Sequence, residues 1–371
     1  MPNPAQLETF TAGAETAVDV AHIERQLHEL WQLAAESEKD PSRRAITRAS
    51  LFNLVALCET DADRDHATET ISALTSRHPC RAIVVLAKPN EPRAELSASI
   101  SAHCHLAGGG QKQVCCEQIS IYASGESTGQ LASAVLPLLE SDLPTVIWWQ
   151  GIFLARPGLF RHLIAVTDKL IYDTSTWDAP ELFLGALHQV SVDQPRCSPA
   201  LSGTSFADLS WTRLGFWRKL TAECFDDPQC RAALDRIRSV EIAHGSRPGA
   251  RLRALLYGSW LAAQLRWTPR DAAAKVRLSS RKDTDATAAG LLSVELKTDD
   301  ATICIRKNYG ELTASAQVTM SNVCGLPRKR AFWPTDDASL LSQELDRFAP
   351  DSVYKDALAM AAALVPLLPE R

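Results

Sequence analysis

The first half of the chain alternates short, mostly apolar segments with helical patterns, and this alternation restricts the possible folds more than any other feature. Such apolar segments occupy residues 50–57, 81–87, 145–149 and 169–172. A strand that is buried on both faces has a near-continuous apolar sequence, and helices then cover both faces of its sheet. The first half therefore predicts an α/β domain with a mostly parallel, helix-covered sheet.

Two longer segments of the same half predict a pair of antiparallel strands. They are residues 95–106 and 113–122, and three consecutive glycines at 108–110 lie between them, as suits a turn between antiparallel neighbours. Apolar residues at helical spacing over residues 20–34 predict an amphipathic helix that packs on a core or on a partner. Further helices are expected at residues 63–76, 128–141, 158–166 and 180–190.

The second half has a different order of elements. Helices are expected at residues 214–224, 229–237, 252–263 and 352–364. Strands are expected at residues 240–243, 275–278, 291–297, 302–306 and 312–318. Strand-like segments in close succession are typical of an antiparallel sheet, so this half predicts an α+β domain. We place an N-terminal helical segment at 1–40, the α/β domain at 41–200 and the α+β domain at 201–371.

Charge and hydropathy point away from nucleic-acid and membrane partners. The formal net charge is −5, and the dense basic run Arg328-Lys329-Arg330 is interpreted as a solvated loop. No stretch approaches the ~18 apolar residues that span a bilayer, and the first ten residues lack the pattern of a signal peptide. We expect a cytoplasmic protein whose ten cysteines are mostly reduced thiols.

The pentapeptide Gly125-Glu126-Ser127-Thr128-Gly129 matches the G-x-S-x-G nucleophile elbow and lies between a predicted strand and a predicted helix. Asp173 and His244 follow downstream, so the order of a Ser…Asp…His triad exists. Ser127 with Gln130 also forms a capping-box pattern, which starts a helix without catalysis. We favour the capping interpretation, and a serine hydrolase that uses Ser127 is the alternative.

A group of histidines and cysteines resembles a set of metal ligands, namely His103, Cys104, His105, Cys115 and Cys116. Adjacent residues in an extended strand point to opposite faces, and a tetrahedral site needs four converging ligands. We therefore expect no metal site there.

The cysteines also include pairs that are candidates for redox chemistry. The pairs are Cys115 with Cys116, Cys224 with Cys230, and Cys304 with Cys324. A disulfide requires close Cα atoms, which the sequence does not define. For cofactors, the glycines at 108–110 precede a strand, so no helix N-terminus joins them in binding a phosphate, and no cofactor is expected.

Trp148 and Trp149 lie side by side in a predicted strand. Their rings should point to opposite faces, so that one ring enters each layer between helix and sheet. Core packing is the favoured interpretation. The alternative is that one ring lies near the carboxyl edge of the sheet, where it would serve a ligand pocket or a partner interface.

Several segments together resemble one known family. They are residues 47–55, 77–85, 116–119, 142–151, 168–175, 208–214 and 253–262. In this order and spacing they resemble the glucose-6-phosphate dehydrogenase assembly proteins, the OpcA family, from about residue 20 to beyond residue 265 and more weakly to the end. The most specific parts are the Leu-Pro-x-Val-x-Trp-Trp element at 143–149 and the Asp-Leu-x-Trp-Thr-Arg element at 208–213.

The resemblance implies a non-catalytic partner that binds glucose-6-phosphate dehydrogenase, favours its active oligomer and supports the oxidative pentose phosphate pathway as an allosteric activator. The dehydrogenase would hold NADP and sugar phosphate. Photosynthetic members are tied to thiol-dependent control, but the cysteines of this chain are not matched to their regulatory pair. Aromatic and arginine side chains anchor interfaces, and the candidates here are Trp148, Trp149, Trp211, Arg213 and Trp217. A sugar-phosphate-binding domain that senses metabolites is a third hypothesis.

Overall fold

The computed structural model describes most of the chain, and the chain divides into two compact units. The described residues are 8–17, 20–37, 45–48, 50–106, 112–192, 203–226, 228–247, 249–281, 290–308, 310–320, 323–324, 328–332 and 335–368. The first unit comprises residues 1–172, 195–206 and 337–349, and the second comprises 173–194, 207–336 and 350–371. Three segments therefore lie in a different unit from the one that the predicted boundaries give them: 173–194 in the second, and 201–206 and 337–349 in the first.

A nine-stranded sheet forms the centre of the first unit, and its last strand runs across the unit boundary. Its strands are β1 (Glu8–Ala17), β2 (Ala45–Arg48), β3 (Asn53–Cys58), β4 (Arg81–Lys88), β5 (Glu95–Leu106), β6 (Lys112–Ser124), β7 (Thr145–Trp149), β8 (Lys169–Tyr172) and β9 (Ser205–Asp208). Their order is β1-β5-β6-β4-β3-β7-β8-β9, and β2 pairs with β6. The pairs from β6 through β8 are parallel, and only β1–β5 and β5–β6 among the described pairs of this sheet are antiparallel. The mostly parallel sheet is confirmed.

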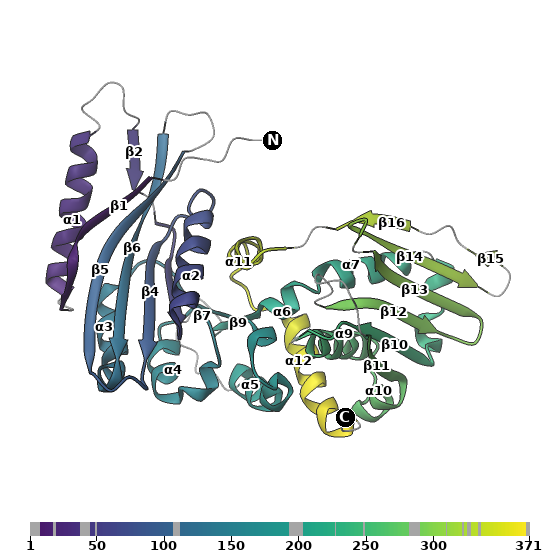
Figure 1. The fold of residues 1–371 in the computed structure, drawn as a ribbon. Coiled ribbons are helices and arrows are strands. Elements are labelled where there is room, and N and C mark those ends of the chain that lie inside the picture. The colour runs from purple at the N-terminus through teal and green to yellow at the C-terminus, as the bar shows by residue number, and fades with distance from the viewer. Residues whose placement is uncertain are drawn as a thin grey trace. The chain divides into compact units, whose positions relative to one another are not determined.

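Helices cover both faces of this sheet (Figure 1). They are α1 (Val20–Ser37), α2 (Asp61–Leu74), η1 (Gly125–Gln130), α3 (Leu131–Val135), η2 (Leu136–Leu138), η3 (Phe153–Ala155), α4 (Pro157–Ile164) and α11 (Asp337–Leu345). All residues of β3 and β7 are buried, as coverage on both faces requires. The single helix predicted at 128–141 is instead three short pieces. Pro137 accounts for one break, because proline has no N–H for the helical hydrogen-bond pattern.

The second unit is built on a seven-stranded sheet that is antiparallel except at one pair. Its strands are β10 (Ser239–His244), β11 (Val276–Ser280), β12 (Leu291–Lys297), β13 (Ala301–Asn308), β14 (Thr313–Met320), β15 (Val323–Cys324) and β16 (Arg328–Ala331). Their order is β11-β10-β12-β13-β14-β15, and β16 also pairs with β14. The parallel pair is β10–β11. The predicted antiparallel sheet is confirmed, with this one parallel pair added to it.

A helical crossover explains the parallel pair, because parallel neighbours require a long connection. The helices of this unit are η4 (Thr174–Thr176), η5 (Pro180–Phe183), α5 (Leu184–Val192), α6 (Leu209–Thr212), α7 (Gly215–Cys224), α8 (Pro228–Arg231), η6 (Leu234–Arg236), α9 (Ala250–Gln264), α10 (Pro269–Lys275), α12 (Ser352–Leu364) and η7 (Val365–Leu367). Helices α9 and α10 connect β10 to β11, and α9 packs between the sheet and α12 (Figure 1). A Cβ at Gly258 would lie 2.9 Å from Val276, so glycine permits this close packing.

The basic run Arg328-Lys329-Arg330 was predicted as a loop, and this prediction is wrong. These residues belong to β16, which pairs with β14 in antiparallel register. The residues of β16 are exposed, so the charges are solvated as expected. Among the described helices, none is both long and apolar enough to cross a lipid bilayer.

Candidate functional site

The parallel strands of the first unit have the order of a doubly wound nucleotide-binding fold. From β6 to β9 the order is β6-β4-β3-β7-β8-β9, which corresponds to the Rossmann order 3-2-1-4-5-6. The strand order reverses between the parallel strands β3 and β7, so their carboxyl ends form the switch point at which such folds bind dinucleotides. This switch point is therefore the first place to look for a site.

Protein side chains contact one another across the switch point. Glu59 follows β3 and Gly151 follows β7. The two residues lie so close that a Cβ on Gly151 would be 3.0 Å from the carboxyl carbon of Glu59. The guanidinium of Arg156 donates to Glu59 over 3.1 Å. Gln150 also closes this edge, because its side-chain amide donates to the Asp63 carbonyl in α2 at 3.1 Å.

The start of α2 is also unsuited to a phosphate. The Thr60 hydroxyl accepts from the Asp63 amide and the Asp63 carboxylate accepts from the Thr60 amide, so a capping box already satisfies amides that would otherwise receive a phosphate. The acidic residues of this first turn are Asp61 and Asp63, and Asp61 is paired with Lys88 at 2.6 Å and with Arg64 at 3.0 Å. The capping box therefore leaves fewer free amides for a dinucleotide pyrophosphate at this helix start.

Ser127 lies in the 3-10 helix η1, and the capping box predicted for it is wrong. Helix η1 begins after Ser124, and no side chain caps η1 or the following helix α3. The cause is local backbone geometry. Gly125 has φ +54°, and a Cβ there would lie 2.9 Å from the Glu91 carbonyl oxygen, so the turn is set by a glycine rather than by a serine cap.

The proposed triad partners of Ser127 already have other contacts. Ser127 belongs to the first unit, whereas Asp173 and His244 belong to the second. Asp173 accepts a hydrogen bond from Arg213 at 2.6 Å. The ring Nδ1 of His244 lies 2.8 Å from the Gly245 carbonyl, and Nδ1 carries the proton because a carbonyl oxygen only accepts. The serine-hydrolase alternative receives no support from this arrangement.

The three candidate cysteine pairs are not bonded to each other. Cys115 is disulfide-bonded, but its neighbour Cys116 is a free, buried thiol whose Sγ lies 2.9 Å from the Thr75 hydroxyl. The residue directly opposite Cys115 in the β5–β6 register is Cys104. The side chains of residues 103–105 lie outside the described residues.

The other two candidate pairs are also not bonded. Cys224, Cys230 and Cys304 are free thiols, and burial raises the pKa of the Cys224 thiol to about 11. Cys304 lies opposite Gln317 of β14, whereas Cys324 lies in β15 on the other side of β14. A whole strand therefore separates this pair. Within the described residues, no group of three or more acidic, histidine or cysteine side chains is placed to hold a metal ion.

The four candidate tryptophans lie in cores and not at a surface. Trp148, Trp149, Trp211 and Trp217 are only 2–3% exposed, which corrects the expectation that they anchor a partner. Trp148 packs edge-on against His66 of α2, and Trp149 packs against aromatic rings of η3 and α4. The expectation that one ring enters each helix–sheet layer is met.

The Asp-Leu-Ser-Trp-Thr-Arg element at 208–213 forms a buried polar network in the second unit. Asp208 is 1% exposed and accepts hydrogen bonds from the Thr174 amide at 3.1 Å, the Thr174 hydroxyl at 2.5 Å and the Ser210 amide at 2.9 Å. Burial is the main cause that raises the pKa of Asp208 to about 7, and the negative charge of Asp173 is the second cause. This carboxyl group is thus poised between its neutral and ionised forms near neutral pH.

Asp173 forms the other half of this network and remains ionised. Its carboxylate accepts from the Ser175 amide and hydroxyl at 3.0 and 2.6 Å, and from the Ser210 hydroxyl at 3.0 Å. Burial opposes its charge most strongly, but Arg213 and Ser175 outweigh burial and lower the pKa of Asp173. Arg213, a candidate interface anchor, is therefore occupied within the fold.

Trp211 connects this element to the last helix and to α7. Its indole N–H donates to the Asp351 carboxylate at 2.9 Å, and its ring packs against Tyr354. The Arg218 guanidinium lies 3.6 Å from the centre of the same ring, in a cation–π arrangement. The motif thus joins four segments of the second unit into one core.

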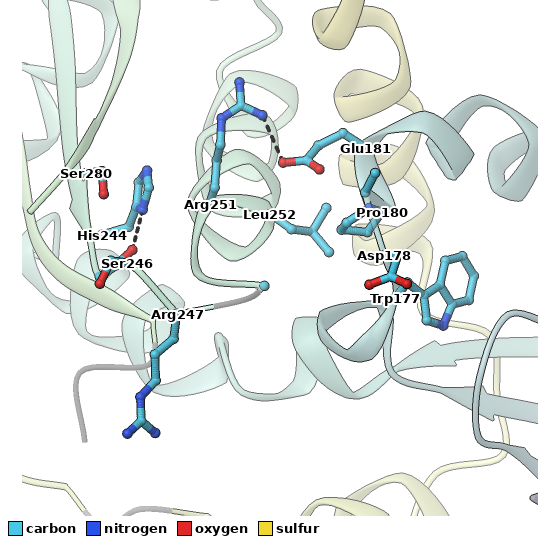
Figure 2. Close-up of a pocket in the computed structure, with 13 residues that line it drawn as sticks. Trp177, Asp178, Pro180, Glu181, His244, Ser246, Arg247, Arg251, Leu252 and Ser280 are labelled. Atoms are coloured by element: carbon cyan, nitrogen blue, oxygen red, sulfur yellow. Dashed lines mark hydrogen bonds and ion pairs between the residues drawn. The ribbon is translucent and has the colours of Figure 1, made fainter. Parts of the chain in front are cut away.

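This network supports one wall of a pocket in the second unit, which we name the α9 pocket (Figure 2). The pocket has a volume of about 550 Å³. Its walls are Trp177, Asp178, Ala179, Pro180 and Glu181 on one side and His244, Gly245, Ser246, Arg247, Gly249, Arg251, Leu252 and Ser280 on the other. The first wall continues directly from the turn that Asp173 and Asp208 fix, and the second follows the carboxyl ends of β10 and β11.

Gly249 brings the two walls together. It is the N-cap residue of α9 and has φ +74°. A Cβ at this position would lie 2.4 Å from the Ser175 Cβ, so only glycine allows the loop to contact the turn.

We expect Gly249→Ala to destabilise the protein by about 2 kcal/mol or more, because both the left-handed backbone and the close contact oppose a side chain. Chemical denaturation followed by circular dichroism measures this loss. Gly215→Ala is the matched control at the start of α7, since a Cβ there would meet nothing within 4 Å. A loss of equal size in both variants would refute the role of Gly249.

Sequence reasoning missed the α9 pocket. Two signals were available: glycines at 245 and 249 between a predicted strand and a predicted helix, and arginines at 247 and 251 beside them. The opposite wall gave no signal, because residues 177–181 meet this loop only through the tertiary fold.

Together, the strand order and the side-chain contacts at the switch point define a protein of the doubly wound α/β class, joined to an α+β unit with a pocket of its own. Two family models match these parts. One describes the N-terminal domain of a glucose-6-phosphate dehydrogenase subunit and matches residues 71–189, and the other describes the C-terminal domain of such a subunit and matches residues 204–358. The chain belongs to this family, the OpcA family.

Curated relatives agree with this assignment. The chain is 27% identical over 338 residues to a putative OxPP cycle protein OpcA of Synechocystis sp., covering 83% of this chain and 67% of the relative. It is 33% identical over 198 residues to the protein of that name in Nostoc punctiforme, covering 52% of this chain and 39% of the relative. The matches thus span from two fifths to two thirds of these relatives' lengths.

The solved structures that match this chain are less similar to it in sequence. A glucose-6-phosphate 1-dehydrogenase from Mycobacterium avium is 12% identical with a TM-score of 0.46, covering 86% of this chain and 92% of that one. An aldose-aldose oxidoreductase from Caulobacter crescentus is 11% identical with a TM-score of 0.41, covering 85% and 96%.

Proposed function

We propose that this protein is a non-catalytic assembly partner and allosteric activator of glucose-6-phosphate dehydrogenase in the oxidative pentose phosphate pathway of the cytoplasm. The observation that carries the proposal is the match of both halves of the chain to the two domains of a glucose-6-phosphate dehydrogenase subunit family. The side-chain contacts across the switch point support a role in which the dehydrogenase, and not this chain, holds the dinucleotide.

An activator of this kind works through a difference in affinity. If the chain binds the active oligomer of the dehydrogenase more tightly than the inactive one, it shifts the population by that ratio. Linkage is reciprocal, so a substrate that favours the active oligomer must tighten the binding of this chain by the same factor. A tenfold ratio corresponds to about 1.4 kcal/mol.

Mixing this protein with the dehydrogenase of the same organism tests the proposal. We expect a larger complex in size-exclusion chromatography with light scattering, and a lower apparent KM for glucose 6-phosphate. The titration should be repeated with saturating substrate to test reciprocity. The proposal fails if neither oligomer size nor kinetics changes.

The same assay, run with and without reductant, tests redox control. Cys115 is disulfide-bonded, so reduction changes the chemistry of the first unit. If redox control operates, Cys115→Ser should abolish the difference between the two conditions. The matched control is Cys304→Ser, because Cys304 is a free thiol on a strand of the second unit. An unchanged response in Cys115→Ser would rule out this cysteine as the switch.

A further inference from the structure

We propose that the α9 pocket binds a small phosphate monoester of a polyol, of the sugar-phosphate class. The phosphate would contact the wall formed by the β10–α9 loop and Ser280, and the hydroxyl groups would contact the wall formed by residues 177–181. This binding is a property of the chain alone and does not depend on the proposed partner.

The phosphate wall lies at the carboxyl ends of two parallel strands and at the start of a helix. His244 and Ser280 are register partners at the carboxyl ends of the parallel strands β10 and β11, the edge at which α/β folds bind ligands. Helix α9 begins at the same point, and its N-cap Gly249 has no side chain to cap the first turn. The Ala250 amide already donates to the Arg247 carbonyl at 3.1 Å, so the amides of Arg251 and Leu252 are the ones in this turn that a negatively charged ligand would meet.

Side chains add to these donors. Ser246 and Ser280 supply hydroxyl groups at the surface of the pocket, and both residues are exposed. Arg247 extends from the same loop (Figure 2) and is also exposed. A guanidinium on an exposed loop forms charge-assisted hydrogen bonds with phosphate at little steric cost.

The opposite wall supplies acceptors. Glu181 and Asp178 line it, and ionised carboxylates only accept hydrogen bonds, so they suit the hydroxyl groups of a polyol. The Glu181 carboxylate is held by Arg251 from the other wall at 2.8 Å, with both side chains about a quarter or less exposed. This pair fixes the position of the carboxylate between the two walls.

The balance of charges decides between ligand classes. Two arginines face two carboxylates across the pocket, so a ligand with negative charge along its whole length would meet repulsion on one wall. A ligand with a phosphate at one end and neutral hydroxyl groups at the other fits both. A volume of about 550 Å³ lies within the usual range for small-molecule sites.

Calorimetric titration of the full chain tests the proposal with three probes: inorganic phosphate, glucose and glucose 6-phosphate. We expect glucose 6-phosphate to bind at least tenfold more tightly than either of the others. Absence of binding by glucose 6-phosphate, or equal affinity for it and for glucose, would overturn the proposal.

Ser280→Asp and Ser279→Asp form a matched pair of variants. Both serines are exposed residues of β11, and adjacent strand residues point to opposite faces, so only Ser280 lines the pocket. A carboxylate at 280 should weaken glucose 6-phosphate at least tenfold through repulsion of the phosphate, whereas the same charge at 279 should have less than a twofold effect. Equal effects in the two variants would refute this location.

Glu181→Gln tests the hydroxyl wall separately. The substitution removes the negative charge that pairs with Arg251 and replaces one acceptor oxygen by an amide donor, so inorganic phosphate should bind as tightly as before or more tightly, while the preference for glucose 6-phosphate falls. A parallel loss of both affinities would contradict the assignment of the two walls. Because these titrations contain no dehydrogenase, their failure leaves the mixing assay unaffected, and failure of the mixing assay leaves them unaffected.

Discussion

Replacing Arg81 by methionine should lower the free energy of unfolding of the first unit by about 3–5 kcal/mol. The Arg81 side chain is 3% exposed and its Nε lies 2.5 Å from the Glu117 carboxylate, which is 1% exposed. Arg81 also donates to the Leu138 carbonyl at 2.9 Å and contacts Glu24 and Glu140, each at 3.1 Å. Its loss leaves a buried carboxylate without its cation.

Denaturant unfolding followed by circular dichroism measures the effect. Arg77→Met is the control, because Arg77 pairs with Asp346 but is 66% exposed, and exposed pairs contribute about 0–1 kcal/mol. Arg81→Met with Glu117→Leu should recover much of the loss, since the uncompensated charge is then gone. Equal losses for the Arg77 and Arg81 variants would show that burial does not control this pair.

Asp208→Asn should change the pH dependence of stability more than any other single carboxyl replacement in the network. The folded-state pKa of Asp208 is raised to about 7 from 3.8, so between these values the folded state binds a proton that the unfolded state has released. Stability from this group is therefore fully present below about pH 4 and is lost as the pH rises to 7. Three pKa units correspond to about 4 kcal/mol.

The measurement is the difference in unfolding free energy between wild type and Asp208→Asn from pH 5 to pH 8. We expect the wild type to lose stability relative to the variant across this range. Asp271→Asn is the control, because hydrogen bonds from Thr268 lower the pKa of Asp271. The difference in unfolding free energy between wild type and Asp271→Asn should therefore stay constant above pH 5 and change only in acid. A flat difference for Asp208 as well would contradict its raised pKa.

Local sequence patterns determine much of this fold. The predicted ranges for β5, β7, β8, β12 and α12 have the same bounds as the elements in the structure, because each is a compact apolar or amphipathic segment between polar turns. The strands β1 and β9 were not predicted, because their formation depends on neighbouring segments of the fold. β1 is formed at an edge against β5, and β9 consists of four residues that end on a polar capping aspartate.

The roles of the motif residues were harder to predict than their positions. The sequence identifies the Asp-Leu-Ser-Trp-Thr-Arg element, but aromatic and arginine residues suit a core as well as an interface. Their roles depend on distant partners: Trp211 meets Asp351 and Arg213 meets Asp173. These contacts join segments up to 140 residues apart, and no local pattern encodes them.

The basic strand β16 has a consequence for the behaviour of the protein in solution. It pairs with β14 near one end of the second unit's sheet, where unpaired backbone groups invite other chains to add strands. Its arginine and lysine side chains are exposed, and Arg330 is in turn paired with Glu223 at 3.4 Å. When this part of the sheet meets the same part of a second copy of the protein, their positive charges repel each other. The basic strand β16 therefore protects the sheet against self-association into fibrous aggregates.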